Sequence, residues 1–88
     1  IEANIIEHES GVDGNTAMQI AKLGEKIRNL REHGLEEGAS TRLLIYAGKL
    51  ITQGIHPRRA CQVAVNWAVT DDPSIQQSIE EIISAIFE

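Results

Sequence analysis

The 88-residue chain has only one cysteine, two prolines and three aromatic residues. A single cysteine cannot form an internal disulfide, so the chain lacks the cross-linked framework of small secreted domains. No apolar run approaches the ~20 residues that a membrane-spanning helix requires, and no segment has the pattern of a signal peptide. With 42% hydrophobic residues, the chain is too apolar for a disordered tail and long enough for one domain. Because it begins with Ile1 rather than methionine, we expect it to be part of a longer protein.

Charge is unevenly distributed along the chain. Residues 1–40 carry a net charge of −4 and residues 71–88 a net charge of −5, whereas residues 41–70 carry +4 and contain no acidic residue. The basic middle third can attract the acidic ends within the fold, or it can leave one face for an anionic ligand. The overall charge of −5 argues against a nucleic-acid partner, because affinity for DNA depends on neutralising phosphates.

The hydrophobic spacing predicts an all-α fold, a small helical bundle of four helices with a possible short fifth helix at the N-terminus. Apolar residues recur at intervals of three and four through residues 15–33, 41–53, 57–69 and 73–88. In residues 1–10, Ile1, Ile5 and Ile6 would share one face of a helix too short to be stable alone. The connections of two to six residues are typical of a helical bundle.

Capping residues set the expected helix ends. Asn15 or Thr16 is expected to cap the first long helix, and Ser40 or Thr41 the second. Prolines at the first helical position, after His56 and Asp72, predict the start of the last two helices. The predicted buried faces consist of apolar residues at helical spacing: Ile20, Leu23, Ile27 and Leu30; Leu44, Ala47, Leu50 and Ile51; Ala60, Cys61, Ala64, Val65 and Ala68; and Ile75, Ile79, Ile82, Ile83 and Ile86.

Catalytic motifs are absent from this sequence. It has no phosphate-binding loop of the G-x-x-x-x-G-K-[ST] type, no G-x-G-x-x-G motif and no set of zinc ligands at a known spacing. His56 and Cys61 could form a nucleophile pair, but Cys61 fits better as a small core residue. Trp67 is expected to fill the core, with contact to another domain as the alternative.

Arg42 is the most informative residue. It lies in the first turn of a predicted helix, where a cation is unfavourable because the helix N-terminus already carries partial positive charge. A compensating anion is therefore expected. The acidic side chains of Glu36 and Glu37 are one candidate, and a phosphate bound by the guanidinium and free backbone N–H groups is the other.

The segment that surrounds Arg42 resembles a known family. Residues 34–51, GLEEGASTRLLIYAGKLI, are similar to the C-terminal region of the CbbQ/NirQ/NorQ family, a MoxR-related branch of the AAA+ ATPases. The flanking segments ESGVD at 9–13, KIRNL at 26–30 and TDDP at 70–73 agree with it, so that the resemblance covers nearly the whole chain. Residues 34–43 are the most specific part.

The resemblance implies that residues 1–88 are a single lid domain, the small helical part that follows the nucleotide-binding core of an AAA+ ATPase. It implies that Arg42 is the sensor 2 arginine that reaches the γ-phosphate of ATP, aimed by Gly38, Ala39, Ser40 and Thr41. The phosphate loop, the acidic Mg²⁺-binding motif and the trans arginine finger would lie in the core, so we expect no hydrolysis of ATP by this chain alone.

The family also implies partners. Its members act in the cytoplasm as homo-oligomeric rings with a von Willebrand A-type partner, and they activate or assemble target enzymes such as Rubisco or nitric oxide reductase. The alternative is a free-standing helical interaction module that would dock a protein through Trp67 or through Arg58 and Arg59. The sequence leaves open whether Lys49, Arg58 and Arg59 join Arg42 or pair with the acidic ends.

Overall fold

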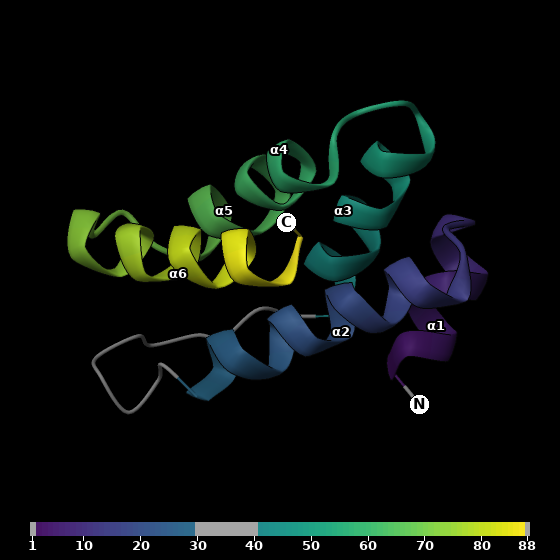
Figure 1. Ribbon diagram of the computed structural model, residues 1–88, viewed down its shortest axis with the longest axis horizontal. Helices are drawn as coiled ribbons and strands as arrows, with labels where there is room; N and C mark the ends of the chain where they lie inside the picture. The colour runs from purple at the N-terminus through teal and green to yellow at the C-terminus, as the bar shows by residue number, and fades with distance from the viewer. Residues whose placement is uncertain (1, 30–40, 88) are drawn as a thin grey trace.

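The computed structural model describes residues 2–29 and 41–87. These residues form helices and no strand, which confirms the predicted all-α fold (Figure 1). The first three helices, α1 (Glu2–Ser10), α2 (Gly14–Asn29) and α3 (Thr41–Thr52), form one group in which each packs against the other two. The short N-terminal helix that the sequence left as a possibility is present as α1, and it gains its stability by packing on α2 and α3.

The second group consists of one continuous helix over residues 57–69 and a final helix over residues 73–86. The continuous helix comprises α4 (Pro57–Cys61), a wider π-helical segment η2 (Gln62–Asn66) and α5 (Trp67–Val69), and it is followed by α6 (Pro73–Ile86). Helix α3 contacts α4 and η2, while α6 contacts η2 and α2. Helices α3 and α6 therefore connect the two groups (Figure 1).

Two acidic caps fix helix starts, and one of them differs from the prediction. The carboxylate of Asp13 accepts a hydrogen bond from the backbone N–H of Thr16 at 2.7 Å, so Asp13 caps α2 and the prediction of Asn15 or Thr16 was wrong. This hydrogen bond lowers the pKa of Asp13, because it stabilises the charged form at the positive end of the helix. The predicted cap at Asp72 is confirmed by a 2.8 Å bond from the N–H of Ser74.

The core draws residues from both groups of helices, and many of them lie at the predicted positions. On α1, Ile6 is buried but Ile5 is 44% exposed, so the expected pairing of both residues on the inner face was wrong. Leu50, Ile51, Ile75, Ile82 and Ile86 are only partly buried against the core. The buried core cluster contains Ile6, Val12, Ala17, Ile20, Leu23, Ile27, Leu44, Ala47, Cys61, Ala64, Val65, Ile79, Ile83 and Phe87.

The π-helical segment explains why Trp67 does not fill the core. A π turn holds one more residue than an α turn, so every later residue moves one position around the helix. The predicted inner positions end with Ala68, but Asn66 is completely buried while Ala68 is exposed. Trp67 is 49% exposed, which corrects the expectation of a core tryptophan. Its indole ring lies 5.4 Å from the guanidinium carbon of Arg59.

A close approach of α1 and α3 depends on Gly48. A Cβ atom at this position would lie 2.7 Å from Cβ of Ser10 and would also collide with the Ser10 hydroxyl. That hydroxyl donates a 2.5 Å hydrogen bond to the carbonyl of Ile6, so the side chain cannot move aside freely. Any larger residue at position 48 must therefore push the two helices apart.

We expect Gly48→Ala to destabilise the fold by about 1–2 kcal/mol, because the cost of overpacking exceeds the gain of about 1 kcal/mol in helix propensity. Equilibrium unfolding in urea, followed by circular dichroism, measures the change. Gly14→Ala is the matched control, because a Cβ there makes only an ordinary 3.5 Å contact with Glu7. Adding Ser10→Gly should restore part of the loss, and a Gly48→Ala variant as stable as the wild type would contradict the close approach.

Candidate functional site

The first turn of α3 carries the residue that the sequence singled out. Thr41 and Arg42 begin this helix, and the side chain of Arg42 is exposed. Within residues 2–29 and 41–87, Arg42 forms no hydrogen bond or ion pair. The predicted supporting residues Gly38, Ala39 and Ser40, and the acids at 36 and 37, lie outside the described residues. The described part of the chain thus holds no anion that compensates the guanidinium.

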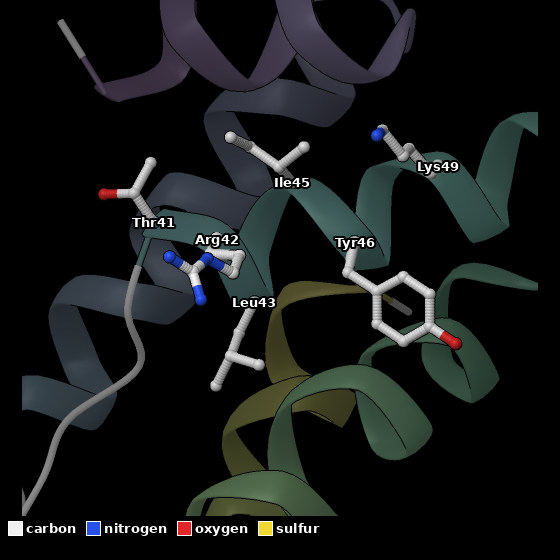
Figure 2. Close-up of a pocket in the computed structure, with 6 residues that line it drawn as sticks. All are labelled: Thr41, Arg42, Leu43, Ile45, Tyr46 and Lys49. Atoms are coloured by element: carbon white, nitrogen blue, oxygen red, sulfur yellow. The ribbon is translucent and has the colours of Figure 1, made fainter.

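A groove runs along the exposed side of α3 from Arg42 (Figure 2). Its volume is about 540 Å³. Arg42 lies at one end and Lys49 near the other, seven residues and therefore about 10 Å further along the helix. Tyr46 is 49% exposed between them. Among the residues that the structure describes, those that line the groove include two cations and no acid: Thr41, Arg42, Leu43, Ile45, Tyr46 and Lys49.

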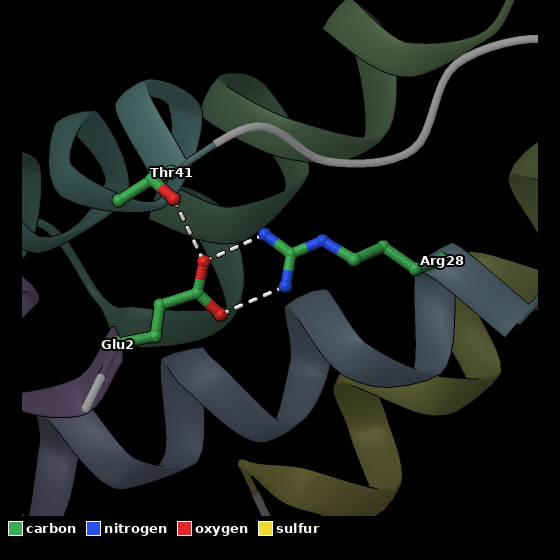
Figure 3. Close-up of polar contacts among 3 residues, drawn as sticks. All are labelled: Glu2, Arg28 and Thr41. Carbon is green, nitrogen blue, oxygen red and sulfur yellow. Dashed lines mark hydrogen bonds and ion pairs between the residues drawn. The ribbon is translucent and has the colours of Figure 1, made fainter.

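A hydrogen-bonded cluster holds the start of α3 in place (Figure 3). The two carboxylate oxygens of Glu2 accept hydrogen bonds of 2.8 and 2.6 Å from the guanidinium of Arg28, and Oε2 also accepts a 2.9 Å bond from the Thr41 hydroxyl. The bonds from Arg28 lower the pKa of Glu2, since they stabilise its charged form. The contribution of this cluster to stability is therefore present at neutral pH and is lost as the pH falls through the lowered pKa of Glu2.

The other two bases of the middle third have different contacts. Arg58 donates a 2.8 Å hydrogen bond from Nε to the backbone carbonyl of Phe87, which fixes the end of the chain to α4. Arg59 donates to the side chain of Gln62 and lies over the ring of Trp67. Neither arginine lines the groove of Arg42, and neither pairs with an acid in the part of the chain that the structure describes. Lys49 alone joins Arg42 in the groove.

The geometry of Cys61 and His56 does not favour a nucleophile pair. Cys61 is completely buried, and this burial raises the pKa of its thiol to about 12. A reactive cysteine needs the opposite shift, because the thiolate is the nucleophile. His56 is exposed and caps α4, where its Nδ1 accepts a 3.3 Å hydrogen bond from the N–H of Arg58. Cys61 is therefore the small core residue that the sequence favoured.

The chemistry available at the start of α3 is the binding of an anion. An exposed guanidinium offers several N–H donors in a plane that matches a phosphate or a carboxylate.

In residues 2–29 and 41–87, no three His, Cys, Asp or Glu side chains come close enough to hold a metal ion. No helix in these residues has the length and apolar character needed to cross a membrane.

The structure places Arg42 in the first turn of α3, where the sequence predicted a helix start, but sequence reasoning did not find the neighbouring cluster of Glu2, Arg28 and Thr41. Glu2 and Arg28 are 26 residues apart, and Glu2 and Thr41 are 39 apart. No periodicity or motif connects residues at such separations. The sequence did contain an acid and a base on two helices that were expected to pack together. Many other pairs of residues meet the same condition, so this signal could not identify Glu2 and Arg28.

Comparisons with known proteins identify the family. The sequence profile of the family described as "CbbQ/NirQ/NorQ C-terminal" matches residues 2–86. The chain is 45% identical to Protein CbbQ of Hydrogenophilus thermoluteolus over 87 residues, which are 99% of this chain and 33% of that protein. It is 44% identical to the denitrification regulatory protein NirQ of Pseudomonas aeruginosa over 82 residues, 93% of this chain and 32% of the relative.

A third relative extends the match to another branch. Protein NorQ of Paracoccus denitrificans is 37% identical over 86 residues, which are 98% of this chain and 32% of that protein. The chain therefore spans about a third of the length of the curated relatives it matches. With a family profile that covers all but a few residues, the chain belongs to the CbbQ/NirQ/NorQ family and corresponds to its C-terminal domain.

Proposed function

We propose that this chain is the lid of a MoxR-related AAA+ ATPase and that Arg42 is its sensor 2 arginine. The observation that carries the proposal is the position of Arg42, exposed in the first turn of α3 and without an anionic partner in the described residues. A cation at the positive end of a helix is unfavourable unless a ligand compensates it. The family membership supports the proposal, since the motif around Arg42 is the most specific part of the resemblance.

Arg42 and the start of α3 would bind the terminal phosphate of ATP. The guanidinium of Arg42 donates hydrogen bonds to the phosphate oxygens, and the positive end of the helix dipole adds favourable partial charge. Bound ATP with Mg²⁺ supplies this phosphate and the free energy of its hydrolysis, and the phosphate loop and the metal-binding acids belong to the ATPase core. Because Arg42 holds the phosphate only before hydrolysis, its contact converts the nucleotide state into a lid position.

The whole protein would then use lid movement to act on another enzyme. We propose that it forms a homo-oligomeric ring in the cytoplasm, works with a von Willebrand A-type partner, and activates or assembles a target such as Rubisco or nitric oxide reductase. The relative from Pseudomonas aeruginosa is named a denitrification regulatory protein, and this name is consistent with a regulatory role.

Nucleotide discrimination tests the role of Arg42. In the full-length protein, Arg42→Ala should reduce the preference for ATP over ADP about tenfold, because one charge-assisted hydrogen bond to the terminal phosphate is lost. Binding of a fluorescent ATP analogue, displaced by ATP or by ADP, measures this ratio. Arg59→Ala is the matched control, since this exposed arginine lies outside the groove. An unchanged ratio in Arg42→Ala would remove the sensor 2 assignment.

The exposed indole of Trp67 favours a second candidate, a protein-interaction module that acts without nucleotide. The ring is half exposed beside Arg59, and such a tryptophan is typical of a surface that buries area against a partner. Tight binding of a protein partner in the absence of nucleotide, lost in Trp67→Ala and retained in Arg42→Ala, would favour this candidate over the lid.

A further inference from the structure

Glu2 joins three helices at one point. It lies at the start of α1, accepts two hydrogen bonds from Arg28 near the end of α2, and accepts a third from Thr41 at the start of α3 (Figure 3). The carboxylate is partly shielded from solvent, since 23% of the side chain of Glu2 and 37% of that of Arg28 are exposed. A bidentate guanidinium–carboxylate pair fixes both the position and the plane of the carboxylate. The oxygen that meets Thr41 is therefore held from two sides.

Thr41 transmits this geometry to Arg42, because the two residues are adjacent in the first turn of α3. The start of a helix is its least constrained part, since the first four N–H groups have no partner within the helix. The bond from the Thr41 hydroxyl to Glu2 ties that turn to α1 and α2. The pair with Arg28 also neutralises the charge of Glu2, so that this carboxylate does not capture the guanidinium of Arg42.

We propose that Glu2 is a positioning residue for Arg42: through Arg28 and Thr41, it holds the first turn of α3 in the orientation in which Arg42 meets a nucleotide phosphate. This inference rests on the proposed role of Arg42 as the phosphate-binding residue. Binding sites require their contacting groups to be held within about 0.5 Å of the productive geometry by supporting hydrogen bonds. Glu2 and Arg28 supply such support from outside the groove, whereas Thr41 lines it.

The test removes the hydroxyl and leaves the ion pair intact. In the full-length protein, Thr41→Val keeps the shape of the side chain. We expect it to lower the ATP-over-ADP affinity ratio about threefold to tenfold, which is the change in affinity expected when one partly exposed hydrogen bond is lost. Thr41→Ser keeps the donor and should retain the wild-type ratio. Thr52→Val is the matched control, because the Thr52 hydroxyl donates to the carbonyl of Lys49 at the other end of α3. Thermal unfolding of each variant separates a loss of stability from a loss of discrimination.

The outcomes distinguish this inference from the function on which it rests. A loss in Thr41→Val that is absent from Thr41→Ser and Thr52→Val supports positioning by Glu2. If Arg42→Ala loses discrimination and Thr41→Val does not, the positioning role is overturned and the role of Arg42 stands. An equal loss in Thr41→Ser also overturns it, since the hydroxyl is then not the cause. If Arg42→Ala leaves the ATP-over-ADP affinity ratio unchanged, both proposals are wrong. Should Thr41→Val not fold, the same affinity ratio is measured in Glu2→Ala, which removes the bonds to both Arg28 and Thr41, and a wild-type ratio in that variant overturns the positioning role.

Discussion

The full-length protein with Arg42→Ala is expected to turn over ATP about tenfold to a hundredfold more slowly than the wild type. A charge-assisted hydrogen bond to a phosphate is worth about 1.5–3 kcal/mol, and this range corresponds to that change in rate if the contact forms in the transition state. The described residues contain no alternative cation beside Arg42 in the first turn of α3, and Lys49 lies about 10 Å further along the groove. The steady-state release of phosphate measures the effect.

Two further variants sharpen this prediction. Arg42→Lys keeps the charge but loses the planar fork of donors, so it should recover only part of the turnover. Arg59→Ala removes an exposed arginine outside the groove and should turn over ATP at the wild-type rate. The far-ultraviolet circular dichroism of all three variants should match the wild type, because Arg42 and Arg59 are both on the surface. Wild-type turnover in Arg42→Ala would contradict a phosphate contact.

The largest expected effect on stability comes from Asn66→Asp, with a loss of about 3–5 kcal/mol. Asn66 is completely buried, and its amide donates to the carbonyl of Gln76 at 3.2 Å and to the carboxylate of Glu80 at 2.8 Å. A carboxylate at this position replaces a donor with a buried charge that faces two acceptors. Since a domain of this size is stabilised by only about 4–13 kcal/mol, the change should be visible as a large fall in the midpoint of urea unfolding.

Asn4→Asp provides the control for this stability measurement. It makes the same chemical change on the exposed surface of α1, where a surface substitution is expected to alter the free energy of unfolding by no more than about 0.5 kcal/mol. If Asn66→Asp lowered the free energy of unfolding by less than about 1 kcal/mol, the hydrogen bonds from Asn66 to Gln76 and Glu80 would not be important for stability.

The elements of this fold were predictable where local chemistry decides them. Pro57 and the Asp72-Pro73 pair mark helix starts, and Gly54, with a φ of +98°, ends α3 in the left-handed conformation that glycine adopts without strain. The spacing of Ile20, Leu23 and Ile27 identified the buried face of α2. These features were accessible because each depends on residues at most four positions apart.

Prediction failed where the backbone departs from the regular period. The buried positions were assigned on 3.6 residues per turn, and the π-helical segment breaks that count between Gln62 and Asn66. Val65 and the residues before it were therefore placed correctly, whereas Trp67 and Ala68 were placed inside although both are exposed. The wide turn has no signature in residue type, and it lies where the helix packs against α3 and α6.

The candidate site was partly predictable for a related reason. Arg42 conflicts with the local preference of a helix start, and such a conflict can be detected in the sequence alone. The support by Glu2 and Arg28 involves no local conflict, and it becomes visible only when three helices are assembled. The local pattern thus identified Arg42, whose charge has no anionic partner in the described residues, but it could not identify Glu2 and Arg28 as the side chains that orient it.

The wide turn η2 has a consequence for comparing members of this family. It stores one residue that a regular helix would not need, so a relative with a single deletion between positions 62 and 66 could keep the same helix length in space while reverting to α geometry. Because the deletion removes the residue that the wide turn accommodates, the residues after η2 would keep the faces they occupy here, with Trp67 on the outside. A one-residue alignment gap between positions 62 and 66 is therefore compatible with the same inner and outer faces in the helix that follows.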